Sequence, residues 1–252
     1  MNGFRENRVF IVISILIISL FLILDLLLHK GQPVTFDGPT HISNIAQMYA
    51  AMRDGEFPAR WGGGFARYGL PIPVIAQQFT SYLGAFITFV TQDVTVSYTI
   101  VVFIGAFVST LAMYYFLRLY VSPYSALAGA YLFHFAPYRI MNVYIRGALP
   151  EFFSSTFIIL ILISMYYAIK KKLFSGYLML TLSVALLLLT HPFMFIVGSF
   201  LYIPYGLYLL KDKNFVEIKK ISILSIFSVA LGFAVAAYFI VPLFVEIRYF
   251  YY

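Results

Sequence analysis

The sequence contains no cysteine and few charged residues. The absence of cysteine excludes disulfides, thiolate zinc sites and cysteine nucleophiles. Only 11% of the 252 residues are charged, against roughly 25% in soluble domains, and 62% are hydrophobic. The mean hydropathy is +0.90. This composition excludes an ordinary soluble domain, a disordered tail and a fibrous repeat, and the helical period argues against an outer-membrane barrel.

Long apolar runs predict an all-α, polytopic membrane protein, since a helix of about 20 apolar residues crosses a bilayer. The first run is longer than the core of a signal peptide and lacks a small-residue cleavage site, so we expect a retained helix. The candidate runs are Val9–Leu28, Pro71–Val90, Val94–Leu119, Tyr124–Met141, Phe152–Ile169, Phe174–Thr190, Phe193–Leu210 and Ile221–Val241.

The distribution of charge reduces eight runs to seven spans. The N-terminal arginines, the lysines at 170–172 and those at 211–220 should all be cytoplasmic, which eight spans would prevent. Pro71–Val90 has two prolines and several polar residues in its first half, and is better interpreted as an amphipathic surface helix. We therefore expect a cytoplasmic N-terminus, an outer C-terminus and a long first outer loop at 29–93, within one membrane module spanning 1–252.

Arginine and lysine separate in this topology. Seven of the eight lysines fall inside, whereas six of the nine arginines fall outside. Outer arginine runs against the usual bias, and arginine is suited to bidentate contact with phosphate. The excess of basic residues, with arginine on the outer side, therefore predicts anionic lipid or lipid phosphate as a partner, and not nucleic acid.

Asp37, His41 and Asn44 open the long outer loop on one expected helix. Asp37 followed by Pro39 is a good helix start, and the three polar residues are spaced to share a face. A carboxylate beside an imidazole can act as a general base or as a metal-binding pair. The alternative is that Asp37 only caps the helix and His41 packs beside it.

Two further outer motifs carry charge. Arg60 and Arg67 bracket Trp61, the only tryptophan, an arrangement that suits a sugar phosphate or lipid headgroup, or else a simple interfacial belt. Arg139 and Arg146 are seven residues apart and share a face if their helix persists. The alternative there is a salt bridge from Arg146 to Glu151.

Single ionisable residues in the apolar runs complete the set. His191 lies before Pro192 at the outer end of a span, where it could bind substrate or simply sit at a helix break. Asp25 would be costly in lipid, so we expect it to face the bundle. His134 is expected to be a hydrogen-bonded packing residue. No Gly-rich phosphate loop, zinc motif or nucleophile elbow is present.

These motifs, in this order, resemble the GT-C class of membrane glycosyltransferases, and most closely the 6-pyruvoyl-tetrahydropterin-synthase-related membrane proteins, which are related to YfhO-like proteins. The resemblance covers nearly the whole chain. It is carried by Asp-Gly-Pro-Thr-His at 37–41, Gly-Glu-Phe-Pro at 55–58 with Trp61, Gly-Leu-Pro at 69–71, Arg146-Gly147 with Pro150-Glu151, and residues 237–243.

The resemblance implies transfer of a sugar from a polyprenyl-phosphate carrier to an acceptor hydroxyl at the outer face of a prokaryotic cell membrane. It implies that Asp37 activates the acceptor. It implies that outer arginines hold the carrier phosphate. Glu151, in the second outer motif, is our other candidate for a catalytic carboxylate. Some relatives use a divalent metal such as Mg²⁺ or Mn²⁺, for which Asp37 and His41 would be the ligands. Family members are commonly longer, so the chain is either a fragment or relies on acceptor recognition from elsewhere.

Two other functions compete with this interpretation. One is a transporter or flippase of lipid or polysaccharide, for which the outer arginines would form an entrance. Transport should require polar residues through the depth of the bundle, and the inner halves of the expected spans have few. The other is a non-catalytic scaffold for envelope assembly, in which Asp37 is only a helix cap.

Overall fold

The computed structural model describes residues 8–28, 31, 34–64 and 68–249, and within them the chain is helical with short connections. These ranges contain no strand beyond an isolated bridge between Gly62 and Leu70. The helices are α1 (Arg8–Leu22), α2 (Leu24–Leu28), α3 (Gly38–Arg53), α4 (Ile72–Ile75), α5 (Gln78–Thr91), α6 (Val94–Leu117), α7 (Pro123–His134), α8 (Pro137–Met141), the π-helical η1 (Asn142–Arg146), α9 (Leu149–Ile169), α10 (Phe174–Thr190), α11 (Pro192–Leu210), α12 (Phe215–Glu246) and the 3-10 turn η2 (Ile247–Tyr249).

Four helices are long and apolar enough to cross a membrane: α6, α9, α11 and α12. Two shorter apolar helices, α1 and α10, lie beside them. The expected all-α membrane fold is therefore confirmed, while helix length alone supports four of the seven expected spans.

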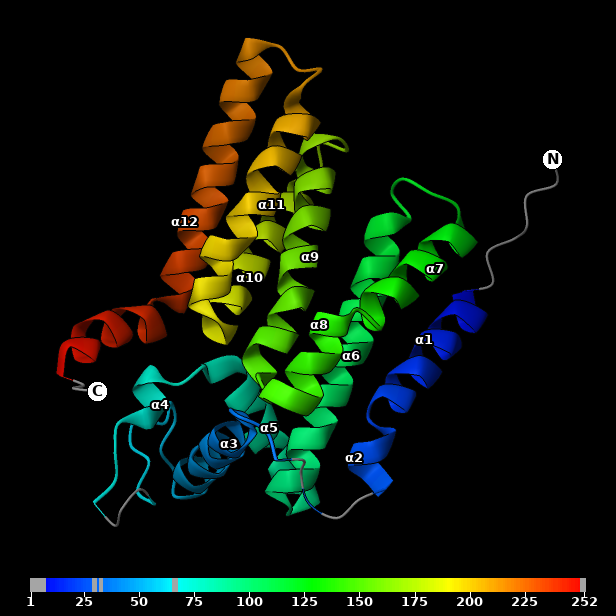
Figure 1. The fold of residues 1–252 in the computed structure, drawn as a ribbon. Helices are drawn as coiled ribbons and strands as arrows, with labels where there is room; N and C mark the ends of the chain where they lie inside the picture. Colours follow the sequence, from blue (N-terminus) through cyan, green and yellow to red (C-terminus); the bar gives the residue numbers. More distant parts are fainter. Residues whose placement is uncertain (1–7, 29–30, 32–33, 65–67, 250–252) are drawn as a thin grey trace.

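Three of the expected runs are broken rather than continuous. The first is interrupted at Ile23, between α1 and α2. The run at Tyr124–Met141 ends its first helix at His134, because Pro137 disfavours a helical residue before it and cannot donate a backbone hydrogen bond. α8 then passes directly into the π-helical turn. The chain still runs from one end of the bundle to the other through these pieces (Figure 1).

The expected surface helix at Pro71–Val90 also differs from the structure. It is divided into α4 and α5, and the polar side chains of Gln78, Thr80 and Ser81 are buried instead of facing water. α5 packs between α3 and α6, while Phe86 and Val90 lie on its exposed side. The expectation of a helix with a wet polar face is wrong, because neighbouring helices cover these side chains, and Gln78 and Ser81 donate to backbone carbonyls instead of water. For example, the Gln78 amide donates to the carbonyl of Pro73 at 2.7 Å.

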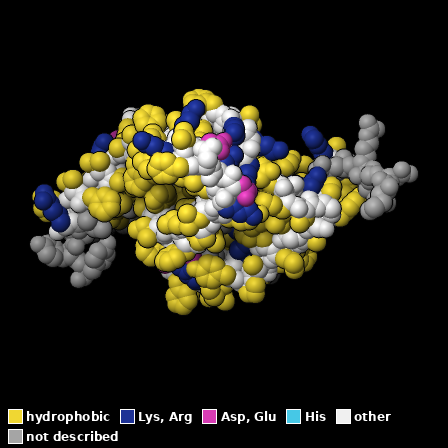
Figure 2. Space-filling model, turned by 90° about the horizontal axis from the view of Figure 1, so that it is seen from above, with side chains coloured by type: hydrophobic (Ala, Val, Ile, Leu, Met, Phe, Trp, Pro, Cys, Tyr) yellow, Lys and Arg dark blue, Asp and Glu magenta, His cyan; other side chains and the backbone are white. Residues whose placement is uncertain are grey.

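The bundle has two distinct ends. The start of α1 and the loops at 118–122, 170–173 and 211–214 lie at the top of Figure 1, and α3, α4 and α5 lie at the bottom. We call the first the lysine end, for the lysines at 170–172 and 211–220, and the second the site end. Figure 2 looks down on the lysine end, where dark blue side chains stand among apolar ones.

Four helices enclose the core. Its buried side chains include Val101 and Ala106 of α6, Phe152 of α9, Leu187 of α10 and Phe239 of α12. α12 approaches α10 through a small residue: a Cβ added at Gly232 would lie 2.9 Å from the Thr181 carbonyl oxygen. Close approach at small residues stabilises helix pairs in lipid, where no hydrophobic force drives association.

Candidate functional site

The segment before α3 and the η1–α9 connection, which the sequence predicts to be the first and second outer loops, are joined by backbone hydrogen bonds at the site end. The amide of Asp37 donates to the carbonyl of Arg146 at 2.7 Å, and that of Phe36 donates to the carbonyl of Ile145 at 3.3 Å. These residues are more than a hundred positions apart in the chain. The two strongest sequence motifs, at 37–44 and 139–151, therefore meet.

Gly147 makes this junction possible. Its φ of +67° is in the left-handed region, and a Cβ added there would lie 2.6 Å from the nitrogen of Gly38 and 2.3 Å from the hydroxyl oxygen of Thr35. The Tyr98 hydroxyl on α6 donates to the Gly147 carbonyl at 3.4 Å. Only glycine has both the conformation and the space that this crossing requires.

Asp37 occupies the N-cap position of α3 without capping the helix through its side chain. The first free amide, that of Gly38, instead donates to the Thr35 hydroxyl at 3.2 Å. Pro39 removes another donor from the first turn. The structure thus departs from the simple cap interpretation, since the carboxylate makes no cap hydrogen bond.

His41 and His191 lie beside the acids of the two loops. His41 is one turn along α3 from Asp37 and is buried. Burial lowers the pKa of His41 to about 4; the negative charge of Asp37 opposes this effect and His191 adds to it. Burial also lowers the pKa of His191; the negative charge of Glu151 opposes this shift, and the positive charge of Arg146 adds to it. Both imidazoles are therefore neutral near pH 7 and can accept a proton or a hydrogen bond.

His191 connects the two halves of this cluster. It lies between α10 and α11, and its buried Nδ1 has no hydrogen-bond partner among the described residues. Its electrostatic partners include His41 on one side and the Glu151–Arg146 pair on the other. An unpaired buried nitrogen costs free energy unless a ligand or water satisfies it, so this is a natural contact point for a ligand hydroxyl.

Arg146 and Glu151 form a well-defined ion pair. Arg146 Nη2 lies 2.8 Å from Glu151 Oε2, and Nη1 lies 2.9 Å from Oε1, from the Asn142 side-chain oxygen and from the Tyr138 hydroxyl. Tyr138 also donates to Glu151 Oε1. The salt bridge that the sequence left as an alternative is thus the observed geometry, and a catalytic role for Glu151 stays a prediction.

Arg139 does not share a face with Arg146. The expected continuous helix is replaced by α8 and a π-helical turn, and Arg139 points into the bundle, 5% exposed. Its guanidinium donates to Ser109 at 2.7 Å and Ser155 at 2.6 Å, and lies 4.3 Å and 4.4 Å from the ring centroids of Phe133 and Phe152. No described carboxylate pairs with it.

The remaining candidate residues are more scattered. Asn44 is buried on α3, one turn beyond His41, whereas Arg60 is exposed in the loop before Trp61. Arg67 lies outside the described residues. Asp25 is exposed on α2, so the expectation that it faces the bundle is wrong. His134 is fully buried with Nδ1 2.7 Å from the Thr110 hydroxyl, which confirms a hydrogen-bonded packing role.

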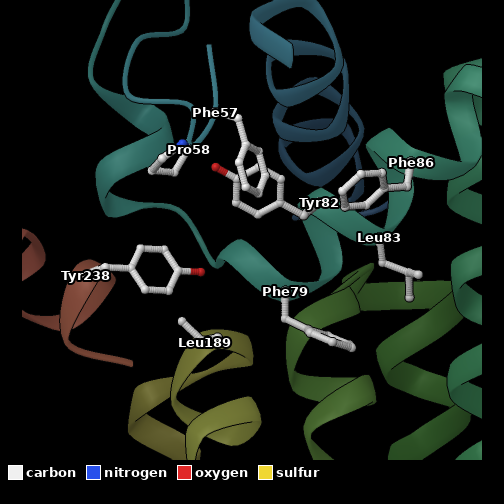
Figure 3. A pocket seen from close by; sticks show the side chains of 8 residues that line it. All are labelled: Phe57, Pro58, Phe79, Tyr82, Leu83, Phe86, Leu189 and Tyr238. Atoms are coloured by element: carbon white, nitrogen blue, oxygen red, sulfur yellow. The ribbon is translucent and has the colours of Figure 1, made fainter. Parts of the chain in front are cut away.

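An aromatic pocket of about 570 Å³ opens at the site end. Its walls come from the 57–58 loop, α5, the end of α10 and α12, and Figure 3 shows Tyr82 and Tyr238 as its only side chains with polar atoms. The lining residues are Phe57, Pro58, Phe79, Tyr82, Leu83, Phe86, Leu189 and Tyr238. Leu189 lies two residues before His191 at the end of α10, so the pocket and the polar cluster are at the same end of the bundle.

Sequence reasoning missed this pocket, although a signal was present. Phe79, Tyr82, Leu83 and Phe86 recur at spacings of three and four residues, which places them on one face of a helix. The contribution of Tyr238, from a helix far along the chain, has no such local signal.

The described residues offer limited metal chemistry. They contain no group of three His, Asp or Glu side chains placed to hold a metal ion. The expected pair, Asp37 and His41, lies on adjacent turns of one helix and supplies two donors at most. A metal held there would need donors from substrate or water.

The comparisons with known proteins give one match. A family model described as the 6-pyruvoyl-tetrahydropterin synthase related domain, a membrane protein, matches residues 78–248. No curated protein and no solved structure matches the chain. The matched region includes α5 to α12, the aromatic pocket's helices and the Arg146–Glu151 pair.

Proposed function

The chain belongs to the 6-pyruvoyl-tetrahydropterin synthase-related family of membrane proteins, and from this premise we propose that it is a glycosyltransferase acting on a lipid-linked sugar. The donor is a polyprenyl-phosphate sugar and the acceptor is a hydroxyl at the outer membrane face. One observation carries the proposal: an apolar aromatic pocket lies at the same end of the bundle as a cluster of Asp37, His41, His191 and the Arg146–Glu151 pair. A polyprenyl phosphate needs apolar surroundings for its chain and polar or cationic groups for its phosphate.

The chemistry assigns a distinct task to each group. The acceptor oxygen attacks C1 of the sugar, Asp37 takes the hydroxyl proton, and the C1–O bond to the carrier phosphate breaks. The electron pair leaves with the polyprenyl phosphate, whose growing negative charge Arg146 stabilises more strongly than it does the ground state. A positioned base contributes roughly 10²–10⁴-fold. The neutral His41, Asn44 and His191 orient hydroxyls by hydrogen bonding.

The proposed topology has seven spans, with the lysine end in the cytoplasm and the site end outside. The six apolar helices α1, α6, α9, α10, α11 and α12 supply six crossings, and the broken segment α7–α8–η1 supplies the seventh. The lysines at one end support this orientation through the positive-inside bias. The cysteine-free chain allows a clean test: Gln92→Cys should react with an impermeant reagent from outside, and Lys171→Cys only from inside.

A donor-cleavage assay with purified protein and a panel of polyprenyl-phosphate sugars tests the function. We expect release of free polyprenyl phosphate with at least one sugar, and its loss in Asp37→Asn. No cleavage across the panel, with or without Mg²⁺ or Mn²⁺ and an added acceptor, would contradict the proposal.

One observation favours a transporter as the second candidate. Arg139 and His134 are buried in the bundle, where they contact Ser109 and Thr110 of α6. The interior of the bundle therefore contains more polar groups than the sequence suggests. A lipid flippase should move a fluorescent lipid-linked sugar across vesicles without cleaving it. That result, with no transfer, would favour transport.

A further inference from the structure

A second cavity lies at the lysine end, far from the groups discussed above. It has a volume of about 310 Å³ and is formed by the ends of α9, α10 and α12. Its lining combines the charged Lys172, Glu217 and Lys220 with apolar side chains, among them Ala168, Tyr177 and Leu224. A cavity with a charged mouth and an apolar wall matches a molecule with a charged head and an apolar body.

The charge around this cavity is strongly positive. Segments 170–172 and 211–220 together contain seven lysines and two acids, Asp212 and Glu217. Lys170 pairs with Asp212 at 3.2 Å, and Lys172 and Lys213 share Glu217 at 2.9 Å and 3.8 Å. Among the described residues, no carboxylate forms an ion pair with Lys220, which is exposed at the mouth of the cavity. The mouth therefore retains positive charge that its own acids do not neutralise.

Exposed apolar side chains surround these lysines. Phe174 is 70% exposed and Phe215 is 79% exposed, both next to the basic segments. Figure 2 shows this mixture of dark blue and yellow side chains at the lysine end. At the depth of the lipid headgroups, lysine ammonium groups typically contact phosphate while neighbouring apolar side chains contact the acyl tails.

We propose that this cavity is a binding site for an anionic phospholipid, with the phosphate between Lys172 and Lys220 and the glycerol and upper acyl chains against Ala168, Tyr177 and Leu224. Basic pockets between membrane helices bind anionic headgroups in this way. Glu217 keeps the Lys172 side chain in place through their ion pair. The site would hold together α9, α10 and α12, three helices that meet here, without taking part in chemistry at the other end.

The test uses the full-length protein in neutral detergent, with native mass spectrometry of bound lipid and thermal unfolding. Phosphatidylglycerol and phosphatidylcholine with identical acyl chains are the probes. We expect phosphatidylglycerol to be retained and to raise the unfolding temperature, and phosphatidylcholine to do neither. Lys172→Gln with Lys220→Gln should lower the affinity for phosphatidylglycerol by about fivefold for each lysine removed.

The matched control is Lys211→Gln with Lys219→Gln. It removes the same charge from the same end but changes no residue that lines the cavity. The control should keep phosphatidylglycerol affinity within about twofold of the unmodified chain, since the remaining attraction is diffuse and screened by salt.

Three results would overturn the site. Equal loss in both double variants would mean diffuse attraction without a site. Equal retention of phosphatidylcholine would mean that the apolar wall alone binds. Displacement of phosphatidylglycerol by millimolar glycerol phosphate would identify a soluble phosphate ligand instead of a lipid. If the Lys172 and Lys220 variant fails to fold, the unmodified chain provides the test. Retention of phosphatidylglycerol that is as strong in 0.5 M salt as in 0.05 M salt would exclude phosphate contact by these lysines.

Discussion

The two ends of the bundle place their charges in opposite ways. At the lysine end the charged residues are sequence neighbours and mostly exposed, and three of the seven lysines form ion pairs with two surface carboxylates. At the site end the charged and polar residues come from the start of α3, η1, α9 and the α10–α11 connection; His41 and Asn44 are buried, and Asp37, Arg146, Glu151 and His191 are half-buried. Buried ionisable groups are costly and persist where the surrounding fold holds them in position.

This difference indicates where specificity resides. Exposed lysines respond to any anionic surface and are screened by salt. Groups that hydrogen bonds and partial burial hold in place at the site end keep a more fixed orientation, so their electrostatic effect on a reacting atom is larger. The predictions below test whether the site end has this preorganised chemistry.

The largest effect is expected at Asp37. Asparagine has the same shape and caps helices about as well as aspartate, but it cannot take a proton. Donor cleavage by Asp37→Asn should fall a hundredfold or more, on the scale of a lost general base. Its thermal unfolding should stay near that of the unmodified chain, since the aspartate side chain makes no cap hydrogen bond. Near-normal transfer by Asp37→Asn would leave Glu151 or Asp25 as the acid to test next.

Whether a feature of the fold or the site could be predicted depends on how far apart in the sequence its interacting residues lie. Apolar runs and lysine clusters are local in sequence, so the helical membrane fold and the grouping of lysines at one end were predictable. The proximity of 37–41 to 146–151 was suggested only by the order of motifs. The crossing itself depends on Gly147 and Gly38, whose close approach no spacing reveals.

The failures have the same origin. Arg139 was placed with Arg146 because seven residues return to one face of an ideal helix, but the chain enters a π-helical turn at Asn142. The polar half of α5 was expected to face water, yet α3 and α6 cover it. In both cases tertiary packing overrode a local pattern. The pocket likewise joins α5 to Tyr238, and only the folded chain brings them together.

The loop crossing is the next test of the site end. Gly147→Ala places a Cβ against the backbone of Gly38 at a positive φ. A non-glycine residue in this conformation costs about 1–3 kcal/mol, before the clash is counted. We expect a lower unfolding temperature and weaker donor cleavage together. Gly63→Ala is the control, since a Cβ there meets no atom within 4 Å and its φ is not positive. Equal stability of the two variants would show that the crossing is not formed.

A pH titration tests the burial of His41. Its pKa is about 4 in the folded protein and near 6.5 when unfolded, so the unfolded chain binds more protons between these values. The stability that this group contributes is fully present above pH 6.5 and is lost as the pH falls toward 4. Between pH 7 and 5.5 the loss should be about 1 kcal/mol. His41→Gln should flatten this part of the unfolding curve, and an unchanged curve would mean that His41 is accessible to water.

The smallest effect separates the two roles of Arg146. Lysine at this position keeps the charge but cannot contact a phosphate or carboxylate through two parallel hydrogen bonds. If Arg146 holds the carrier phosphate, Arg146→Lys should weaken donor binding about threefold to tenfold, the range of one lost hydrogen bond.

Glu151→Gln weakens the ion pair yet leaves the guanidinium in place, so it should lower stability more than donor affinity. Arg139→Lys, deep among Ser109, Ser155 and two rings, should act on stability alone, because Arg139 is only 5% exposed. Binding of a fluorescent donor to the three variants distinguishes these outcomes. Unchanged donor affinity in Arg146→Lys, with a lower unfolding temperature, would mean that Arg146 only fastens the second loop to α9, and that the carrier phosphate must be held elsewhere at the site end.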